Sequence, residues 1–571
     1  MKSNSFTRIR ILSLCVVVVA VILIGKLYSL QIISGESFRM KAERQYLRPN
    51  DTIYDRGKIF FQNKDGTLFS AATLKTGYTI GMNPKVLEDA QVAFEKINAI
   101  TPIDKESFFE HAKQKNSSYA IVAKKTEEEE ADKIEALELP GIMIYKDRYR
   151  YYPSGNLGSN VLGLVGYKGD IFAGRYGLES YYDDTLSRDT SSLYSNFFAE
   201  IFSSIKKSVD PQSKFEGDIV TTIEPNAQDF LQKQLIAIED KWGSKTSGGI
   251  IMDPKTGEIF AMANYPTFDP NALQNETDPG IFSNPSVEHV FEMGSIVKPL
   301  TMAAGLDSGT ITTASTYTDK GFLTLNGSKI SNFDGKGRGL VEMQVILNDS
   351  LNTGAAYIAG KMGNKLFTQY FKNFGLGEET GIDLPNETPG LIKNLESPRD
   401  IEHATASYGQ GIAMSPISTV RALASLANGG YLVTPHLVKR IDYSLGVSKK
   451  ISYDKGAQVL KPETSETISR MLVTVVDKAL LGGSVKIPNY SVAAKTGTAQ
   501  IAKTTGGGYY GDRYLHSFFG YFPAYNPKFI VFLYTIEPKG VGGDFASHTL
   551  TAPFMEIVKF LINYYKVPPD R

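Results

Sequence analysis

A single long apolar stretch near the N-terminus is the feature that most limits how this chain can fold. Residues Ile11 to Gly25 carry no charge, and three basic side chains precede them. As a helix the stretch spans about 22 Å, and extending it to Ile33 gives about 34 Å, enough to cross a bilayer. The extension includes Lys26, whose long side chain can reach the far interface. The sequence therefore predicts a membrane anchor at residues 11–33.

Two interpretations of this stretch differ in whether it is retained. A signal peptide also has a basic start and an apolar centre, but it ends in a cleavage site of small residues. Here the chain continues with the bulky run Leu27-Tyr28-Ser29-Leu30-Gln31, which favours an uncleaved anchor. Positive charge before the helix keeps the N-terminus in the cytoplasm. We expect a cytoplasmic tail at residues 1–10, one pass through the cytoplasmic (inner) membrane, and the rest of the chain outside the cytoplasm.

The composition of the whole chain excludes several classes of protein. Its 571 residues are 42% hydrophobic and 21% charged, which is typical of a folded protein of several domains. Lys plus Arg and Asp plus Glu both total 61, so no net charge attracts nucleic acid. The single cysteine, Cys15, excludes an internal disulfide, and the six histidines are scattered without an HExxH pattern. No metal, cofactor or nucleic-acid partner is expected.

The region after the anchor, residues 35–216, is predicted to be a mixed α/β domain. It alternates strand-like runs, such as Gly77 to Gly81, with charged helical stretches. An acidic run at Glu127 to Glu130 lies inside one helical pattern, and such a run usually forms a solvated helix face. Residues 187–216 are rich in Ser and Asp and predict a loop or domain junction.

Residues 217–571 are predicted to form one α+β domain. Two apolar runs, Gly249 to Asp253 and Glu258 to Met262, flank a Pro/Gly turn, which is typical of a β-hairpin. The stretch from about 290 to 430 is mostly helical in pattern. Strands at both ends with helices between them predict one sheet built from N- and C-terminal segments. The C-terminal strand-like runs are Tyr490 to Ala494, Ser517 to Phe522 and Phe529 to Ile536, followed by a helix at Phe554 to Tyr565.

Three short motifs, in a fixed order, indicate the chemistry of this second domain. Each of them alone occurs often by chance, and a serine at a helix start is normally a cap. Together, in suitable local structure, they form the ordered set S-x-x-K, S-x-N and K-T-G. The motifs are Ser295-Ile296-Val297-Lys298 after Gly294, Ser350-Leu351-Asn352, and Lys495-Thr496-Gly497-Thr498.

Ser295 is the predicted nucleophile and Lys298 its predicted base. At a helix start, the lysine at i+3 shares a face with the serine hydroxyl. Lysine is a base only when neutral, and lowering its pKa from about 10.4 to near 7 requires burial and a neighbouring cation, here Lys495. Ser350 is predicted to relay a proton to the leaving amine, and Asn352 to orient Lys298 and the substrate backbone.

The third motif is predicted to bind substrate. It comes at the end of an apolar strand-like run, and Gly497 has no side chain to block a peptide lying along the strand edge. This arrangement suits an extended peptide that adds to the sheet. Lys495, Thr496 and Thr498 offer a cation and hydroxyl groups for a terminal carboxylate.

With these residues, the chain resembles the class B penicillin-binding proteins, which are membrane-anchored D,D-transpeptidases that crosslink peptidoglycan. Arg56-Gly57-Lys58-Ile59 is similar to a motif after the anchor, although Phe60-Phe61-Gln62-Asn63 replaces the usual continuation. Met293-Gly294 stands where Pro-Gly is common. Segments that resemble the pedestal motifs and the start of the catalytic domain are Arg150 to Pro153, Gly163 to Gly166, Gly177 to Glu179, and Gly217 to Glu224.

The resemblance implies an α+β fold in three parts. A penicillin-binding or serine β-lactamase-like transpeptidase domain, an antiparallel sheet with flanking helices, occupies residues 217–571. An elongated, dimerisation-like pedestal at residues 35–216 and one transmembrane helix precede it. By analogy with the class, backbone N–H groups of Ser295 and Thr498 form an oxyanion hole, and Arg56 pairs with Glu179 in the pedestal.

The resemblance also implies substrates, inhibitors and partners. These are peptidoglycan stem peptides ending in D-Ala-D-Ala, β-lactams as covalent inhibitors, and a membrane-embedded glycan polymerase with other proteins of the division or elongation complex. Several segments are more similar to the cell-division (septal) enzyme than to the elongation enzyme, which stays an alternative. A β-lactamase or β-lactam sensor on the same fold and a catalytically silent scaffold are further alternatives. The segments are Phe374 to Gly377, Thr380 to Ile382, Gly409 to Ile412, Gly507 to Tyr509, and Ser517 to Tyr521.

Overall fold

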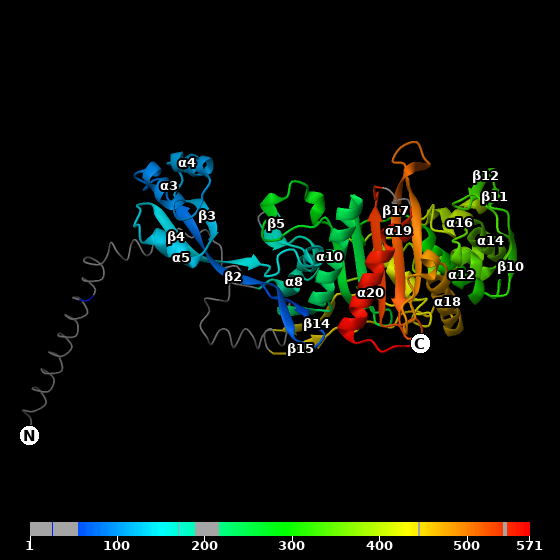
Figure 1. Cartoon of the computed structure of the whole chain (residues 1–571). Coiled ribbons are helices and arrows are strands. Elements are labelled where there is room, and N and C mark those ends of the chain that lie inside the picture. Colours follow the sequence, from blue (N-terminus) through cyan, green and yellow to red (C-terminus); the bar gives the residue numbers. More distant parts are fainter. Residues whose placement is uncertain (1–25, 27–54, 169–170, 189–215, 444–445, 541–544) are drawn as a thin grey trace, which may run out of the picture. The chain divides into compact units, whose positions relative to one another are not determined.

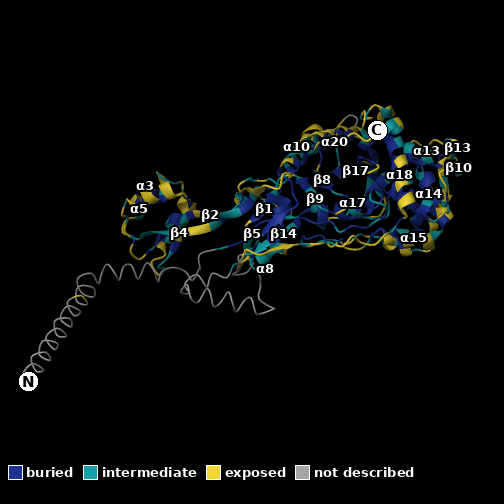
Figure 2. Cartoon of the chain, turned by 90° about the horizontal axis from the view of Figure 1, so that it is seen from below, coloured by how far each residue is buried: buried dark blue, intermediate teal, exposed yellow. Residues whose placement is uncertain are grey.

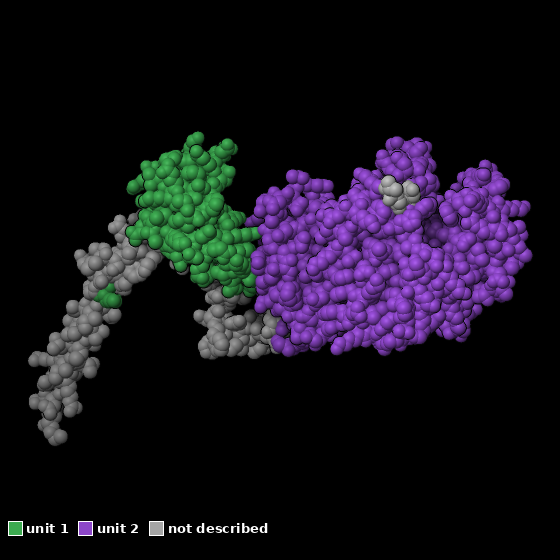
Figure 3. All heavy atoms as spheres, viewed as in Figure 1, with its two compact units in different colours: residues 1–55, 74–149, 189–206 green, residues 56–73, 150–188, 207–571 purple. Residues whose placement is uncertain are grey.

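The described part of the chain forms two compact units, coloured separately in Figure 3. The computed structural model describes residue 26 and residues 55–168, 171–188, 216–443, 446–540 and 545–571. Among these residues, unit 1 consists of Lys26, Asp55 and residues 74–149, and unit 2 of residues 56–73, 150–188 and the described chain from residue 216 onward.

The predicted membrane anchor at residues 11–33 lies outside the described residues except for Lys26. Within the described part of the chain, no helix combines the length and the apolar character needed to cross a bilayer. The Ser- and Asp-rich junction predicted at residues 187–216 also lies almost entirely outside it.

Unit 1 is a small α/β unit. The later part of strand β2 (Leu68–Met82) pairs antiparallel with β3 (Ala120–Thr126), and β4 (Ile142–Tyr151) also pairs with β2. The strand predicted at Gly77 to Gly81 lies within β2. The acidic run begins helix α5 (Glu128–Glu135), and its exposed side chains confirm a solvated face. Helices α3 (Ala90–Asn98) and α4 (Lys105–Lys113) complete this unit, and the core contains Ile80, Met82, Ile97, Phe108 and Ile134.

A first sheet of unit 2 combines segments that are far apart in the sequence. Strand β1 (Ile59–Gln62) pairs antiparallel with the start of β2 and parallel with β7 (Gly217–Thr221). On the other side of β7 lie β14 (Val438–Tyr443) and β15 (Ser448–Lys450). This pairing explains why residues 56–73, predicted as pedestal, are grouped with the catalytic region by compactness. Residues 150–188 are grouped there as well, and Tyr152 and Asn271 exchange two hydrogen bonds between these segments. The predicted domain limit at residue 217 remains a prediction.

The central sheet of unit 2 has five strands in the order β16-β17-β18-β8-β9, all antiparallel. Strands β8 (Thr246–Met252) and β9 (Ile259–Tyr265) form the predicted hairpin, and β18 (Phe529–Ile536) matches its predicted bounds. Strand β17 (Tyr509–Phe522) contains the predicted run Ser517 to Phe522 but begins earlier.

Strand β16 (Ala493–Ala502) begins three residues later than the run predicted at Tyr490. Asn489, with a φ of +66°, and a turn in which Tyr490 N–H donates to the Ile487 carbonyl delay its start. The K-T-G motif therefore lies in the first half of this strand, and not at its end as predicted. Since β16 is the first strand of the sheet, the motif lies on a sheet edge.

Helices cover both faces of the central sheet, and side chains of β17 alternate between them. Phe518 points to α20 (Thr551–Tyr565), where its ring lies 4.2 Å from that of Phe554. Phe519 belongs to the larger core on the opposite face. Figure 1 shows α20 and α10 (Pro225–Trp242) against one face, and Figure 2 shows how completely the strands between the layers are buried.

The other face packs against a helical region, as predicted for residues 290–430. Two pairs of four-residue antiparallel strands inside it were not predicted: β10 (Thr316–Asp319) with β13 (Gly339–Glu342), and between them in the chain the hairpin of β11 (Phe322–Leu325) with β12 (Ser328–Ser331). Strands this short carry too little alternation to be recognised in a sequence. The helices are α12 (Lys298–Asp307), α13 (Met343–Asn348), α14 (Asn352–Met362), α15 (Asn364–Asn373), α16 (Asp400–Ala406), α17 (Pro416–Ala424) and α18 (Pro462–Thr474).

Shorter elements connect these layers. They are α6 (Ser159–Leu162), α7 (Gly177–Tyr181), α8 (Asp183–Leu186), α11 (Pro285–Glu288), α19 (Ala546–Thr549) and the hairpin of β5 (Val165–Lys168) with β6 (Ile171–Gly174).

Candidate active site

Ser295 lies in a 3₁₀ turn, η5 (Gly294–Val297), immediately before α12. The predicted helix start at the serine is therefore present, with a first turn that is 3₁₀ and with α12 continuing from Lys298. In a 3₁₀ turn, side chains at i and i+3 are directly in line. The Nζ atom of Lys298 accordingly lies 2.9 Å from Ser295 Oγ, which is the predicted pairing of these residues.

The turn that carries Ser295 is held by close contacts between backbones. Gly294 has a φ of +65°, and a Cβ atom on it would lie 2.8 Å from the Thr498 carbonyl oxygen. A Cβ atom on Gly409 would lie 2.3 Å from the Gly294 carbonyl oxygen. Side chains at these two glycines would therefore push apart the three segments that meet behind the nucleophile.

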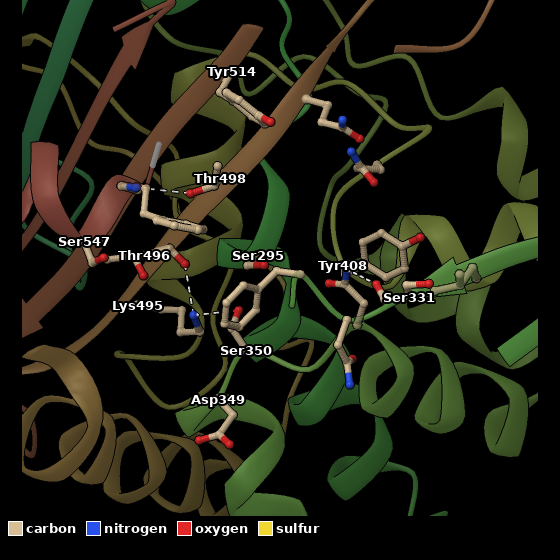
Figure 4. Close-up of a pocket in the computed structure, with 18 of the residues that line it drawn as sticks. Ser295, Ser331, Asp349, Ser350, Tyr408, Lys495, Thr496, Thr498, Tyr514 and Ser547 are labelled. Atoms are coloured by element: carbon tan, nitrogen blue, oxygen red, sulfur yellow. Dashed lines mark hydrogen bonds between the residues drawn. The ribbon is translucent and has the colours of Figure 1, made fainter. Parts of the chain in front are cut away.

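Ser350 lies between the two motif lysines. It follows α13 and has a φ of +54°, a conformation that costs a non-glycine residue about 1–3 kcal/mol. Its hydroxyl is 3.1 Å from the Nζ atoms of both Lys298 and Lys495, and its carbonyl oxygen is 2.5 Å from Lys298 Nζ. Figure 4 shows Lys495 directed at Ser350 in this way. The strained turn thus directs two oxygen atoms of one residue towards the lysines.

Both motif lysines are buried, and among the described residues neither has a carboxylate partner. Lys298 is 1% exposed and Lys495 is 3% exposed, and neither forms a salt bridge with a carboxylate of the described residues. Burial lowers the pKa of Lys298 well below its usual value, and the neighbouring Lys495 lowers this pKa further. Burial also lowers the pKa of Lys495, to about 8. Both causes that the sequence analysis named for Lys298 are present.

Asn352 has a different partner from the one expected. Its side-chain amide donates to the carbonyl oxygen of Ser331 at 2.9 Å, at the end of β12. The next residue, Thr353, donates from its hydroxyl to the buried carboxylate of Asp319 at 2.8 Å. Asp319 and Asn332 next to Ser331 are joined by two further hydrogen bonds. The sequence analysis missed these residues, because they reach the motif only through the unpredicted strand pairs.

Gly497 is required for a reason other than the one predicted. A Cβ atom on it would lie 2.4 Å from Ser517 Oγ and 2.7 Å from the Met293 carbonyl oxygen, so it faces the protein and not the open strand edge. The Ser517 hydroxyl itself donates to the Met293 carbonyl at 2.8 Å. Gly497 therefore allows β16 to approach the segment that carries the nucleophile.

The three motifs meet in one open cleft of about 1080 Å³ in unit 2. Ser295, Ser350 and Asn352 line it together with Lys495, Thr496 and Thr498, and Lys298 is buried behind Ser295. The hydroxyl of Thr498 accepts a hydrogen bond from the Ala546 N–H at 3.1 Å, and its proton remains available to a ligand. Figure 4 shows how β16, the S-x-x-K turn and the S-x-N turn converge on this space.

Comparison with known proteins identifies the family of this chain. The family model described as "Penicillin binding protein transpeptidase domain" matches residues 248–558, and that described as "Penicillin-binding Protein dimerisation domain" matches residues 54–194. The chain is 31% identical over 561 residues to stage V sporulation protein D of Bacillus subtilis, covering 95% of this chain and 84% of that protein. It is 26% identical to penicillin-binding protein PbpB of Mycolicibacterium smegmatis, covering 100% and 92%.

Solved structures show the same fold. The structure of penicillin-binding protein 2X from Streptococcus thermophilus has a TM-score of 0.70 at 18% identity, covering 89% of this chain and 80% of that chain. That of penicillin-binding protein 3 from Mycobacterium tuberculosis has a TM-score of 0.68 at 21% identity, covering 91% and 98%. The chain belongs to the penicillin-binding proteins. Its two matched domains are those of the class B members, as its motifs predicted.

Proposed function

We propose that this protein is a peptidoglycan D,D-transpeptidase that crosslinks stem peptides through an acyl-enzyme on Ser295. The observation that carries the proposal is the contact between Ser295 Oγ and Lys298 Nζ, 2.9 Å apart, with the lysine buried and its pKa lowered. A neutral amine in hydrogen-bond contact is what a serine hydroxyl needs to become a nucleophile.

The proposed reaction has two halves. Ser295 Oγ attacks the carbonyl carbon of the penultimate D-Ala, and its proton passes to Lys298. The peptide bond breaks, and the leaving amine of the terminal D-Ala takes a proton through Ser350, whose hydroxyl contacts both lysines. The amine of a second stem peptide then attacks the ester. That amine loses a proton, which returns to Ser295 as the ester bond breaks.

The substrate is proposed to lie extended along the free edge of β16. Peptides that add to a sheet edge gain main-chain hydrogen bonds, and this edge carries Lys495, Thr496 and Thr498 for the terminal carboxylate. Gly497 serves the packing of the strand behind the substrate. The backbone N–H groups of Ser295 and Thr498 are assigned to the oxyanion hole, where one donor is typically worth about 10²–10³ in rate. Asn352 is assigned to the substrate backbone.

The decisive experiment is mass spectrometry of the intact protein after incubation with labelled penicillin. We expect one adduct per chain on Ser295 and none on Ser295→Ala. An adduct on the Ser295→Ala variant would contradict the assignment. A chromogenic cephalosporin tests the alternative of a β-lactamase: a transpeptidase gives stoichiometric acylation, whereas a β-lactamase gives steady hydrolysis. A scaffold without activity would give neither.

The location and the biological setting form the second part of the proposal. Residues 11–33 are proposed to anchor the chain in the cytoplasmic membrane after a cytoplasmic tail at residues 1–10, with a pedestal at residues 35–216 and the transpeptidase domain at 217–571 outside the cytoplasm. Septal synthesis, with a membrane-embedded glycan polymerase as partner, is the favoured setting, and elongation is the alternative. The motif segments that resemble the division enzyme support this choice.

Truncation tests the second part. Removing residues 1–34 should give a soluble protein that still binds penicillin. A chain in which the anchor is joined directly to residues 217–571 should fail to support septal crosslinking in cells. Because residues 56–73 and 150–188 are grouped with the catalytic region, a second graft that retains them is the matched control for folding. Normal division with either graft would contradict a docking role for the pedestal.

A further inference from the structure

The active-site cleft has a charge pattern that the proposed reaction does not use. Lys329, Arg338 and Lys495 line it, and Asp349 is the single acidic residue among the described residues of its wall. Asp349 directly follows α13 and directly precedes Ser350, and 41% of its side chain is exposed. An accessible carboxylate thus belongs to the cleft-lining residue that precedes Ser350 in the chain.

Asp349 forms only a long ion pair, with Arg338. One of its oxygen atoms lies 3.3 Å from Arg338 Nε, and this arginine makes a closer contact, 2.8 Å, with Asp334, which is not part of the cleft wall. Within the described chain, neither motif lysine forms a salt bridge with Asp349. Figure 4 shows the Asp349 carboxylate turned away from Lys495. The carboxylate is therefore available to a cation that enters the cleft.

The chemistry of the second half-reaction brings such a cation to this place. Aminolysis of the ester is the reverse of acylation, with one amine exchanged for another. The incoming nitrogen must therefore occupy the position that the leaving nitrogen vacated, beside Ser350 Oγ. A primary amine arrives at neutral pH as an ammonium ion, and its attack requires the neutral form. A site that concentrates the ammonium form next to Ser350 would favour transfer to an amine over transfer to water.

We propose that Asp349 is the entry site for the acceptor, binding the primary ammonium group of the second stem peptide. This inference rests on the proposed function and adds a specificity residue to it. The ammonium ion exchanges with Arg338 at the Asp349 carboxylate and loses one proton to solvent. The neutral amine moves to Ser350 and attacks the ester carbonyl carbon. The C–N bond forms, the C–O bond to Ser295 breaks, and the second amine proton passes through Ser350 and Lys298 to Ser295 Oγ.

The test compares Asp349→Asn with Asp334→Asn in the full chain. Both changes remove one carboxylate from Arg338 at nearly constant volume, but only the first removes a charge from the cleft wall. The donor is a peptide ending in D-Ala-D-Ala, and the acceptor is a peptide with one free primary amine. Rates of crosslinked and hydrolysed product are measured over a range of acceptor concentrations, and acylation by penicillin reports that each variant is folded.

For Asp349→Asn we expect the acceptor KM to rise about threefold to tenfold, the range for one partly screened charge pair, with kcat unchanged. Transfer to hydroxylamine, which is neutral at the assay pH, should not change. Asp334→Asn keeps the Asp349 charge but releases Arg338 to compete for it, so its acceptor KM should rise less than that of Asp349→Asn. High salt should reduce the difference between the two variants.

Three results would overturn the inference. These are an unchanged acceptor KM in Asp349→Asn, an equal loss with hydroxylamine, or the same rise in Asp334→Asn. Each of them leaves the proposed function intact if the wild-type protein is acylated and forms crosslinked product. A wild-type protein that is not acylated by penicillin would contradict the proposed function itself, whatever Asp349 does.

Discussion

Unit 2 contains two pairs of buried basic side chains, which differ in whether a carboxylate contacts them. At the active site, Lys298 and Lys495 are buried and both contact Ser350, and neither forms a salt bridge with a carboxylate of the described residues. Near β1, Arg56 and Arg150 are 2% and 5% exposed, and Glu179 lies between them, fully buried. Each arginine Nε atom is 2.6 Å from a different oxygen of that carboxylate. The pairing of Arg56 with Glu179 that the resemblance implied is therefore present.

The difference determines what each group does. Burial alone would raise the pKa of Glu179, but Arg150 and Arg56 outweigh burial, and its pKa lies below the usual value. Arginine does not lose its proton in proteins, so this cluster keeps its charges at any pH of interest. Lysine can lose its proton, and two buried lysines without an anion relieve their repulsion in that way. Glu179 therefore makes the arginine cluster a permanent ion pair that stabilises the fold. Without such a carboxylate, the lysine pair can supply a base.

Lys298→Arg tests the comparison most strongly, because it places a guanidinium group, the cation of the arginine cluster, in the active site. The guanidinium group stays protonated and cannot accept the proton of Ser295. We expect acylation by penicillin to fall by about 10²–10⁴, the usual contribution of a general base, and Lys298→Ala to fall similarly. Stopped-flow acylation measures this effect. If the arginine variant kept full activity, Lys298 would not be the base.

Glu179→Gln tests the arginine cluster by removing the carboxylate that Arg56 and Arg150 share. Arg150 would then lose its carboxylate partner, and Arg56 would keep only Asp183, whose oxygen lies 2.7 Å from Arg56 Nη1. Loss of one partner of a buried pair typically costs about 3–5 kcal/mol. We expect a large fall in melting temperature. The matched control is Glu129→Gln in unit 1, an exposed partner of Lys133 on α5, which should leave the melting temperature unchanged. Similar melting temperatures for the two variants would show that Glu179 is not needed as a counterion.

Lys495→Met should have the opposite effect on stability. Its folded pKa of about 8 lies below the unfolded value of about 10.4, so burying the charged form destabilises the protein by roughly 3 kcal/mol below pH 8. The variant should therefore melt at a higher temperature than the wild type at pH 7. This advantage should shrink as pH rises from 8 and vanish near pH 10.4. A lower melting temperature for the variant at pH 7 would contradict a buried, unmatched charge.

The pH profile of acylation gives the smallest expected effect. Acylation needs neutral Lys298, so its rate should fall about tenfold per unit below the pKa of that residue and level off above it. Because Lys495 helps to lower this pKa, its replacement by Met should move the midpoint of the profile upward. The midpoint, and not the height of the plateau, is the measurement of interest. A midpoint that stays in place would assign the whole shift to burial.

Much of the site could be predicted, because its reactive residues lie in short sequence motifs that follow one another in a fixed order. The spacing of Ser295 and Lys298 fixes their contact within one turn, whether that turn is α or 3₁₀. The alternating strands β8, β9 and β18 were also predictable from their apolar runs. These features depend on residues that are close together in the sequence.

The features that were missed depend on contacts between distant segments. The partner of Asn352 is the carbonyl group of Ser331, 21 residues earlier in the chain, and no local sequence pattern predicts this contact. Gly497 is determined by Ser517 and Met293, which approach it only in the folded chain. The left-handed backbone at Ser350 is likewise enforced by its surroundings, since the residue type does not favour it.

The edge position of β16 has a consequence for the solubility of the protein. A strand that is left without a neighbour so that a peptide can dock also offers its hydrogen bonds to the strands of other molecules. A closed cleft would prevent such aggregation but would exclude the substrate. Here the edge lies in a recess whose wall includes Ser331 of β12 and Ser547 of α19. Mutations that cut back these walls should therefore promote self-association before they affect the chemistry.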